Sequence, residues 1–176
     1  MATTATQAVR QGWLERLLPN QLLAVASAIL FACAVVAVAK GRADWAQVPL
    51  LVWVHLASIL VATGLTPVML LRRKGDGRHR KLGYVWVSAM LLTAITSLFF
   101  NTGVNGGWGV FTGDFSFIHI LSVFVLLMVP VIVARARRHD RSGHESAVRG
   151  MVIGALLVAG FFTFPFNRLL GHWLLS

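Results

Sequence analysis

The stretch "HLASILVATGLTPVMLLRRKGDGRH", from His55 to His79, joins a long apolar segment to a basic turn. No Asp, Glu, Lys or Arg occurs between His55 and Leu71, and the apolar segment begins earlier, at Val48. A helix needs about 20 mostly apolar residues to cross the hydrocarbon core of a membrane, and this segment is long enough. The stretch therefore predicts a transmembrane helix followed by a basic cytoplasmic loop that begins at Arg72.

The whole chain of 176 residues has the same character. Hydrophobic residues make up 57% of it and charged residues 12%, whereas about 25% of residues are charged in soluble domains. Five apolar runs are long enough to span a membrane: Gln21–Ala39, Val48–Leu71, Leu82–Phe100, Phe115–Ala134 and Ala147–Phe166. The first run lacks a good cleavage site, so we interpret it as an uncleaved span. We predict an all-α integral membrane protein with five transmembrane helices, made of a cytoplasmic N-terminal segment, residues 1–20, and a single transmembrane domain, residues 21–176.

The positive charges are distributed unevenly along the chain. The formal net charge is +10, and thirteen of the sixteen Lys and Arg residues lie in three segments that alternate with the predicted spans. These residues are Arg10 and Arg16; Arg72, Arg73, Lys74, Arg78, Arg80 and Lys81; and Arg135, Arg137, Arg138, Arg141 and Arg149. Because basic residues concentrate in cytoplasmic loops, we expect the N-terminus and the second and fourth loops inside and the C-terminus in the periplasm. The expected partners are anionic lipid headgroups. Nucleic acid is not an expected partner, because the sequence has no basic groove pattern interleaved with aromatic residues.

A second stretch, "HILSVFVLLMVPVIVARARRHDRSGH" from His119 to His144, repeats the layout of the first. Each copy begins with a histidine, has a serine three residues later and one proline near its middle, and has an Asp 21 residues after the first histidine. Each copy closes with a second histidine, 24 residues after the first in one copy and 25 in the other. The repetition predicts that the last four helices form a four-helix bundle of two similar hairpins.

The repeat sorts four histidines into two pairs by depth. His55 and His119 begin spans that run in the same direction, so both are expected near the outer side. His79 and His144 precede the two returning spans, so both are expected at the cytoplasmic edge. Ionisable side chains within or beside a span are functional-site candidates by default.

Histidine pairs of this kind suit one class of cofactor best. Imidazole binds iron, zinc and copper, but zinc takes four ligands and no Cys or carboxylate accompanies the outer pair. The five methionines are scattered and offer no copper-binding cluster. A haem iron needs only one protein ligand on each face, which facing helices of a bundle can supply. The candidate residues for one or two b-type haems are His55 with His119, His79 with His144, and Arg80 and Arg149 as partners of the propionates.

The segment "HRKLGYVWV", together with an upstream intramembrane histidine, His119 and His144, resembles the transmembrane di-haem cytochromes b of the ascorbate-reducible type. In that family four consecutive helices carry four histidines, paired second helix with fourth and third with fifth. The resemblance implies b-type haem and membrane electron transfer. The family usually has six spans, whereas five are predicted here, and its ascorbate-contact residues have no match, so no substrate is implied.

Three further stretches carry a second resemblance, which covers most of the chain after the first span. They are "WVHLASILVATGLTPVMLLRRKGDGRHRKLGYVWVSAMLLTAITSLFF", "SFIHILSVFVLLMVP" and "HESAVRGMVIGALLVAGFFTFPFNRLLGH". They resemble a family of small bacterial multi-span membrane proteins known only as a domain of unknown function. The resemblance implies an inner-membrane location. Many members have Pro-Gly-Arg where this chain has Phe166, Asn167 and Arg168, which puts a role for that turn in doubt.

The sequence leaves the function open between two main classes. One is electron transfer through haem, with a redox partner or a larger membrane complex. The alternative is a haem-free structural or accessory subunit of such a complex, in which the histidines are hydrogen-bonded in the core. Transport of a small ligand is the third interpretation, and hydrolysis is not supported.

Three further expectations concern single residues and their neighbours. Asp76 and Asp140 should make turn contacts or offset the charge of nearby arginines. Glu145 and Arg149 are four residues apart and should form an exposed helix pair. Trp173 should act as an aromatic anchor at the outer interface.

Overall fold

The computed structural model describes residues 18–100, 117–165 and 168–176, and this part of the chain is helical, with no β-strand. The predicted cytoplasmic segment therefore lies mostly outside the described residues, as do Arg10, Arg16 and most of the loop before Phe117. The elements are α2 (Asn20–Lys40), η1 (Gly41–Gln47), α3 (Leu50–Leu71), α4 (Gly77–Ser97), α5 (Phe117–Arg137), α6 (Arg141–Met151), η3 (Val152–Val158), α7 (Ala159–Phe161) and α8 (Leu169–Leu175).

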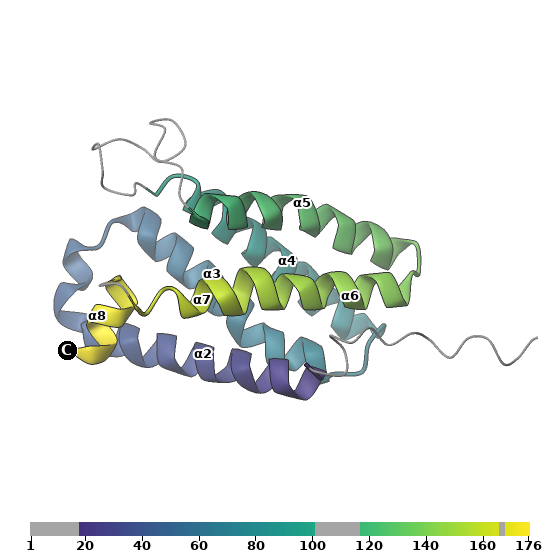
Figure 1. Cartoon of the computed structure of the whole chain (residues 1–176), viewed down its shortest axis with the longest axis horizontal. Helices are drawn as coiled ribbons and strands as arrows, with labels where there is room; N and C mark the ends of the chain where they lie inside the picture. The colour runs from purple at the N-terminus through teal and green to yellow at the C-terminus, as the bar shows by residue number, and fades with distance from the viewer. Residues whose placement is uncertain (1–17, 101–116, 166–167) are drawn as a thin grey trace, which may run out of the picture.

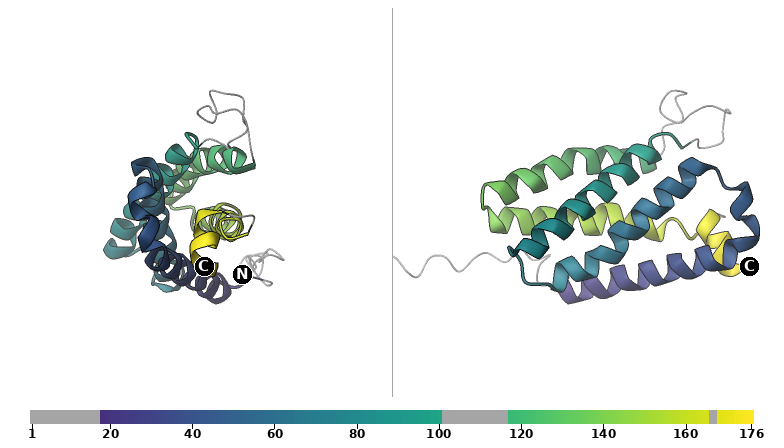
Figure 2. Two further views of the ribbon diagram at one scale, coloured as in Figure 1. Left: turned by 90° about the vertical axis from the view of Figure 1, so that its left-hand side faces the viewer. Right: turned by 180° about the vertical axis from the view of Figure 1, so that it is seen from behind.

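The long helices pack side by side in chain order, α2 on α3, α3 on α4, α4 on α5 and α5 on α6 (Figure 1). Seen from the end, α2 to α5 form an arc, and α6, η3 and α7 lie in its opening (Figure 2). η3 packs against both α2 and α5, so the last long helical segment closes the arc. The short helix α8 packs on α2 and η1 at one end of the bundle. The α3–α4 and α5–α6 turns lie at the other end (Figure 1).

Four helical segments in the described part have the length and composition to cross a membrane. They are Asn20–Gln47, Leu50–Leu71, His119–Arg137 and Arg141–Phe161. The helix α4 is 21 residues long but is not among the four. Its first five residues include Arg78, Arg80 and Lys81, so its apolar part is shorter than the helix itself. The chain is thus a membrane protein with four candidate spans, and the fifth stays a prediction.

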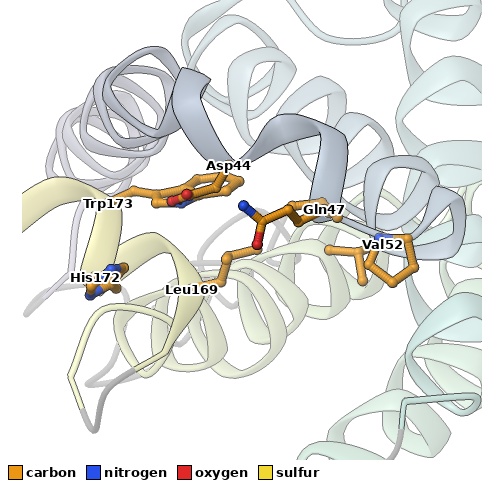
Figure 3. A pocket seen from close by; sticks show the side chains of 8 residues that line it. Asp44, Gln47, Val52, Leu169, His172 and Trp173 are labelled. Atoms are coloured by element: carbon orange, nitrogen blue, oxygen red, sulfur yellow. The ribbon is translucent and has the colours of Figure 1, made fainter.

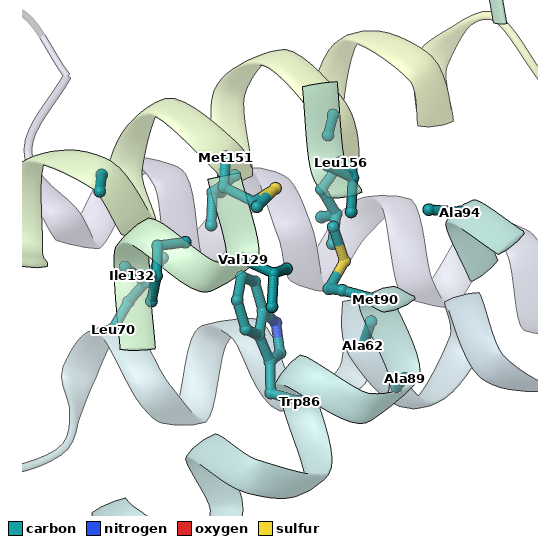
Figure 4. Close-up of a cluster of buried hydrophobic side chains, with 14 of the residues drawn as sticks. Ala62, Leu70, Trp86, Ala89, Met90, Ala94, Val129, Ile132, Met151 and Leu156 are labelled. Atoms are coloured by element: carbon teal, nitrogen blue, oxygen red, sulfur yellow. The ribbon is translucent and has the colours of Figure 1, made fainter. Parts of the chain in front are cut away.

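The bundle buries a core of mostly medium-sized and small side chains around the indole of Trp86 (Figure 4). Met151 and Ala62 are fully buried, and Trp86, Met90 and Leu156 are nearly so. Large apolar residues also cover the outside of the long helices, among them Leu127, which is 68% exposed. Apolar side chains on both faces of a long helix are typical of a bundle whose outer surface contacts lipid.

The α3–α4 and α5–α6 turns, which we call the inner turns, begin their following helices in the same way. Asp76 accepts a hydrogen bond from the His79 backbone N–H at 2.5 Å, and Asp140 accepts one from the Gly143 N–H at 2.9 Å. A side-chain oxygen at this position satisfies one of the unpaired N–H groups of the first helical turn. The predicted turn contacts of both aspartates are therefore confirmed, and their role is that of helix N-caps.

One segment of the last long helix departs from α-helical geometry. Residues Val152–Val158 form a π-helix between α6 and α7. Such segments are rare and occur frequently at functional sites. It begins about one turn beyond Arg149, and both Arg149 and Val152 line a cavity between the helices.

Candidate functional site

A cavity of about 600 Å³ lies at the end of the bundle that carries the two inner turns. Its walls come from the end of α3, the first turns of α4, the last turns of α5, and α6. The volume is within the roughly 300–1,000 Å³ that is typical of sites for cofactors and small molecules. We call it the inner cavity.

The inner cavity brings together one of the two predicted histidine pairs. Both His79, in the first turn of α4, and His144, in the first turn of α6, line it. His144 Nδ1 lies 3.1 Å from the backbone oxygen of Ile132. Because a carbonyl oxygen only accepts, this nitrogen carries the proton, and Nε2 keeps the lone pair that a metal needs.

His79 is half-buried, and its Nδ1 is a buried atom with no hydrogen-bond partner among the described residues. A buried polar group without a partner is uncommon in native proteins and calls for an explanation. Burial of the ring, followed by the proximity of His144, lowers the pKa of His79 below its ordinary value. A neutral imidazole is the form that binds metals.

The floor of the inner cavity is largely apolar and has one internal hydrogen bond. Leu70, Ile132 and Val152 line it, together with the indole of Trp86. Trp86 Nε1 donates to Thr66 Oγ1 at 2.9 Å, and both groups are buried. The bond satisfies the only polar atom of the indole, so this wall presents carbon surface to the cavity.

The rim of the inner cavity carries the positive charge. Cations that line it are Lys74, Arg80, Arg137, Arg141 and Arg149. Glu145 lies among them and is bound by two, at 2.9 Å from Lys74 Nζ and 3.1 Å from Arg141 Nε. Asp140 is the other acid on the rim, and it caps α6. An apolar floor under a cationic rim fits an amphiphilic anion.

The two predicted propionate partners have different surroundings. Arg80 is exposed and lines the inner cavity. Arg149 also lines it, but its guanidinium donates to the backbone oxygen of Leu18 and to Asn20 Oδ1. The expected exposed pair between Glu145 and Arg149 is therefore wrong. Glu145 is bound to Lys74 and Arg141, while Arg149 binds the start of α2.

The outer histidines are not part of the inner cavity. His55, on α3, is directed at α4, where its Nδ1 lies 3.0 Å from Thr96 Oγ1 and 3.1 Å from the Thr93 oxygen. Its ring also makes an edge contact with Phe100. His119, on α5, is only 1% exposed. Among the described residues the structure supplies a cavity for the inner pair and a hydrogen-bonded setting for His55.

Sequence reasoning missed several residues of this site. Trp86 and Thr66 form the floor, and Lys74 and Glu145 bridge its mouth, although none of these was predicted to contribute to a site. The Trp86–Thr66 pair joins two helices across 20 positions of sequence, which no spacing rule reveals. No group of three or more His, Cys, Asp or Glu side chains that could hold a metal ion occurs in the described ranges.

The helices and their composition define the class of the chain as an all-α membrane protein that crosses the bilayer several times. Residues 51–168 match the model of a family described as "Predicted membrane protein (DUF2306)". The match covers more than half of the chain, so the chain belongs to this family, whose function is not known. The predicted resemblance to a membrane family of unknown function is thus confirmed. Neither the curated proteins nor the solved structures contain a match.

Proposed function

We propose that this protein binds one b-type haem in the inner cavity, with His79 and His144 as axial ligands, and that it serves in membrane electron transfer. The observation that carries the proposal is the position of these two histidines on a single cavity of about 600 Å³. They come from helices that begin 64 residues apart, at Gly77 and Arg141, and neither histidine is needed as a cap or an ion-pair partner.

The residues present fit such a group. The half-buried His79 ring and the oriented His144 ring offer two imidazoles, and the floor offers apolar surface. Arg80 and Arg137 are exposed cations on the rim and would neutralise carboxylates of a bound cofactor. A bound haem would supply a one-electron redox centre, whose potential depends on its axial ligands and the surrounding polarity. Arg149 takes a structural role, since its guanidinium already binds α2.

The experiment is a comparison of oxidised and dithionite-reduced absorption spectra of the protein purified in detergent after expression with ample haem. The wild type should show a Soret band that shifts on reduction. His79→Ala and His144→Ala should each remove most of it. The matched control is His139→Asn, because His139 lines the same rim but has a positive φ of 57°, which asparagine tolerates.

The control should keep the full spectrum. A wild type without a Soret band would reject haem binding and favour the haem-free accessory subunit. If His55→Ala and His119→Ala removed the band while His79→Ala kept it, the site would lie at the other end of the bundle.

We also propose five spans rather than four, with the N-terminus in the cytoplasm of a bacterial inner membrane. α4 packs between α3 and α5, and only residues 72–76 separate it from α3. Helices joined by so short a turn lie antiparallel as a hairpin, so α4 returns along α3 through the same layer. The concentration of exposed cations at the two inner turns supports the orientation.

A further inference from the structure

A second cavity, of about 390 Å³, lies at the opposite end of the bundle, between η1 and α8 (Figure 3). We call it the outer pocket. It is lined by Asp44, Gln47, Val48, Pro49, Val52, Leu169, His172 and Trp173. It shares no residue with the inner cavity, and what is inferred from it does not depend on haem binding.

Several contacts hold the two sides of the outer pocket together. Trp173 Nε1 donates to Asp44 Oδ2 at 3.0 Å, and Lys40 Nζ donates to the Leu174 oxygen at 2.8 Å. The indole of Trp173 lies directly on Gly41, where a Cβ would overlap the ring. Because α8 is fixed to α2 and η1 at three points, the outer pocket is a built feature of the fold.

The polar groups of the outer pocket are few and chemically distinct. Asp44 uses one carboxylate oxygen for Trp173, and Oδ1 accepts no hydrogen bond from the residues that the structure describes. Gln47 extends from η1 toward Leu169, next to Asp44 and Trp173 (Figure 3). His172 lies at the edge and is exposed. The site thus offers one charged acceptor, one amide and one imidazole.

The surrounding charges decide which kind of ligand fits. Asp44 alone would attract a cation, but Lys40, Arg42 and Arg168 lie at or beside η1 and the start of α8 and outnumber it, so the net local charge disfavours a cationic ligand. An anionic ligand would meet the carboxylate of Asp44 inside the pocket. A neutral ligand that donates a hydrogen bond to Asp44 meets neither difficulty, because a carboxylate accepts strong, charge-assisted bonds.

The apolar groups extend the same argument to the rest of the ligand. Val48, Val52 and Leu169 line the pocket with carbon, which suits a ring more than an open polar chain. Two residues close in sequence to its lining are exposed leucines, with Leu50 78% and Leu175 86% exposed. Exposed apolar side chains of this kind suit the hydrocarbon tail of an amphiphile.

We propose that the outer pocket binds the headgroup of a quinol, a hydroxylated aromatic ring with an apolar tail. One ring hydroxyl donates to Asp44 Oδ1, and Gln47 bonds the oxygen on the opposite side of the ring. The preference is for the reduced form, since the oxidised quinone has oxygens that only accept and cannot bond the carboxylate.

The test is calorimetric binding of ubiquinol-1 and of ubiquinone-1, each titrated under argon into the full-length protein in detergent. The wild type should bind ubiquinol-1 more tightly than ubiquinone-1. Asp44→Asn keeps an oxygen for Trp173 Nε1 but replaces the free acceptor by an amide N–H, a donor. It should weaken ubiquinol-1 binding by about ten-fold or more, as expected for loss of a bond to a charged group, and leave ubiquinone-1 binding unchanged or stronger.

Two further variants keep the test independent of folding. Gln47→Ala changes an exposed side chain and should weaken both forms. Asp76→Asn removes the same charge at the far end of the bundle, where asparagine still caps α4, and should change neither. The proposal is overturned if the wild type binds neither form, if Asp44→Asn weakens both forms equally, or if tetramethylammonium displaces ubiquinol-1.

Discussion

Gly41 lies where the C-terminal helix α8 packs on the rest of the fold, and its lack of a side chain makes room for the indole of Trp173. It begins η1 directly after α2 and is buried under the indole of Trp173. Gly41→Ala should destabilise the protein by about 1–3 kcal/mol, the usual effect of inserting a methyl group into a packed contact. The measurement is thermal unfolding in detergent. Gly77→Ala is the matched control, because a Cβ there would have open space around it, and its midpoint should stay within error of the wild type.

Trp173 itself shows what a local sequence pattern cannot reveal. An aromatic residue near a membrane boundary predicts an interface anchor, but Trp173 is 1% exposed and hydrogen-bonded to Asp44. The interface prediction is therefore wrong for this residue. The fold turns α8 back onto η1, which lies 129 positions away, so the burial depends on tertiary packing that composition does not encode.

Replacement of Arg149 should lower stability, whereas replacement of Arg80 should affect the cofactor, although the sequence suggests the same role for both residues. Arg149→Met removes the bonds to Leu18 and Asn20, so we expect the free energy of unfolding to fall by about 1–3 kcal/mol, with the haem spectrum retained. Arg80→Met should leave stability nearly unchanged and shift the reduction potential of a bound haem. Differential scanning fluorimetry and a redox titration distinguish the two. A loss of the spectrum in Arg149→Met with unchanged stability would return Arg149 to the cofactor site.

At the scale of helices, the two inner turns offer a matched pair of caps. Asp140 caps α6 through the Gly143 N–H. Asp140→Ala should lower the free energy of unfolding by about 0.5–2 kcal/mol, whereas Asp140→Asn should be close to neutral, because asparagine is an equally good cap. Unfolding in a series of denaturing detergent mixtures measures both. Equal loss in the two variants would mean that charge, rather than the cap oxygen, is the important property.

The two capping aspartates also show which structural features of the repeat could be predicted from the sequence. The shared positions of Asp76 and Asp140 predicted equivalent turns, and both caps are present. Inside the helices the copies diverge. The first copy contains Thr66, which binds Trp86, while the second copy leads into the π-helix that begins at Val152. Turn chemistry is local and can be inferred from short motifs, whereas hydrogen bonds between helices and π-helical segments depend on neighbours that are distant in sequence.

At the scale of the whole molecule, the number of spans can be decided by finding the side of the membrane on which each of three positions lies. Arg73 lies after α3, Ser142 lies after α5, and Ala46 lies before α3. If α3, α4 and α5 all cross, Arg73 and Ser142 are on one side of the membrane and Ala46 is on the other. If α4 does not cross while α5 does, Ser142 moves to the side opposite Arg73.

Single-cysteine labelling measures this directly. Cys33 is the only cysteine, so Arg73→Cys, Ser142→Cys and Ala46→Cys would each be made in a Cys33→Ser background and exposed to a membrane-impermeant maleimide. With five spans and the N-terminus inside, intact spheroplasts should label only position 46, and inverted vesicles should label positions 73 and 142. Labelling of 73 and 142 from opposite sides would reduce the count to four, and would place His79 and His144, which line one cavity, on opposite sides of the membrane. Because one cavity cannot open at both surfaces, that outcome is incompatible with the packing of α3 to α6 and hence with the proposed haem site.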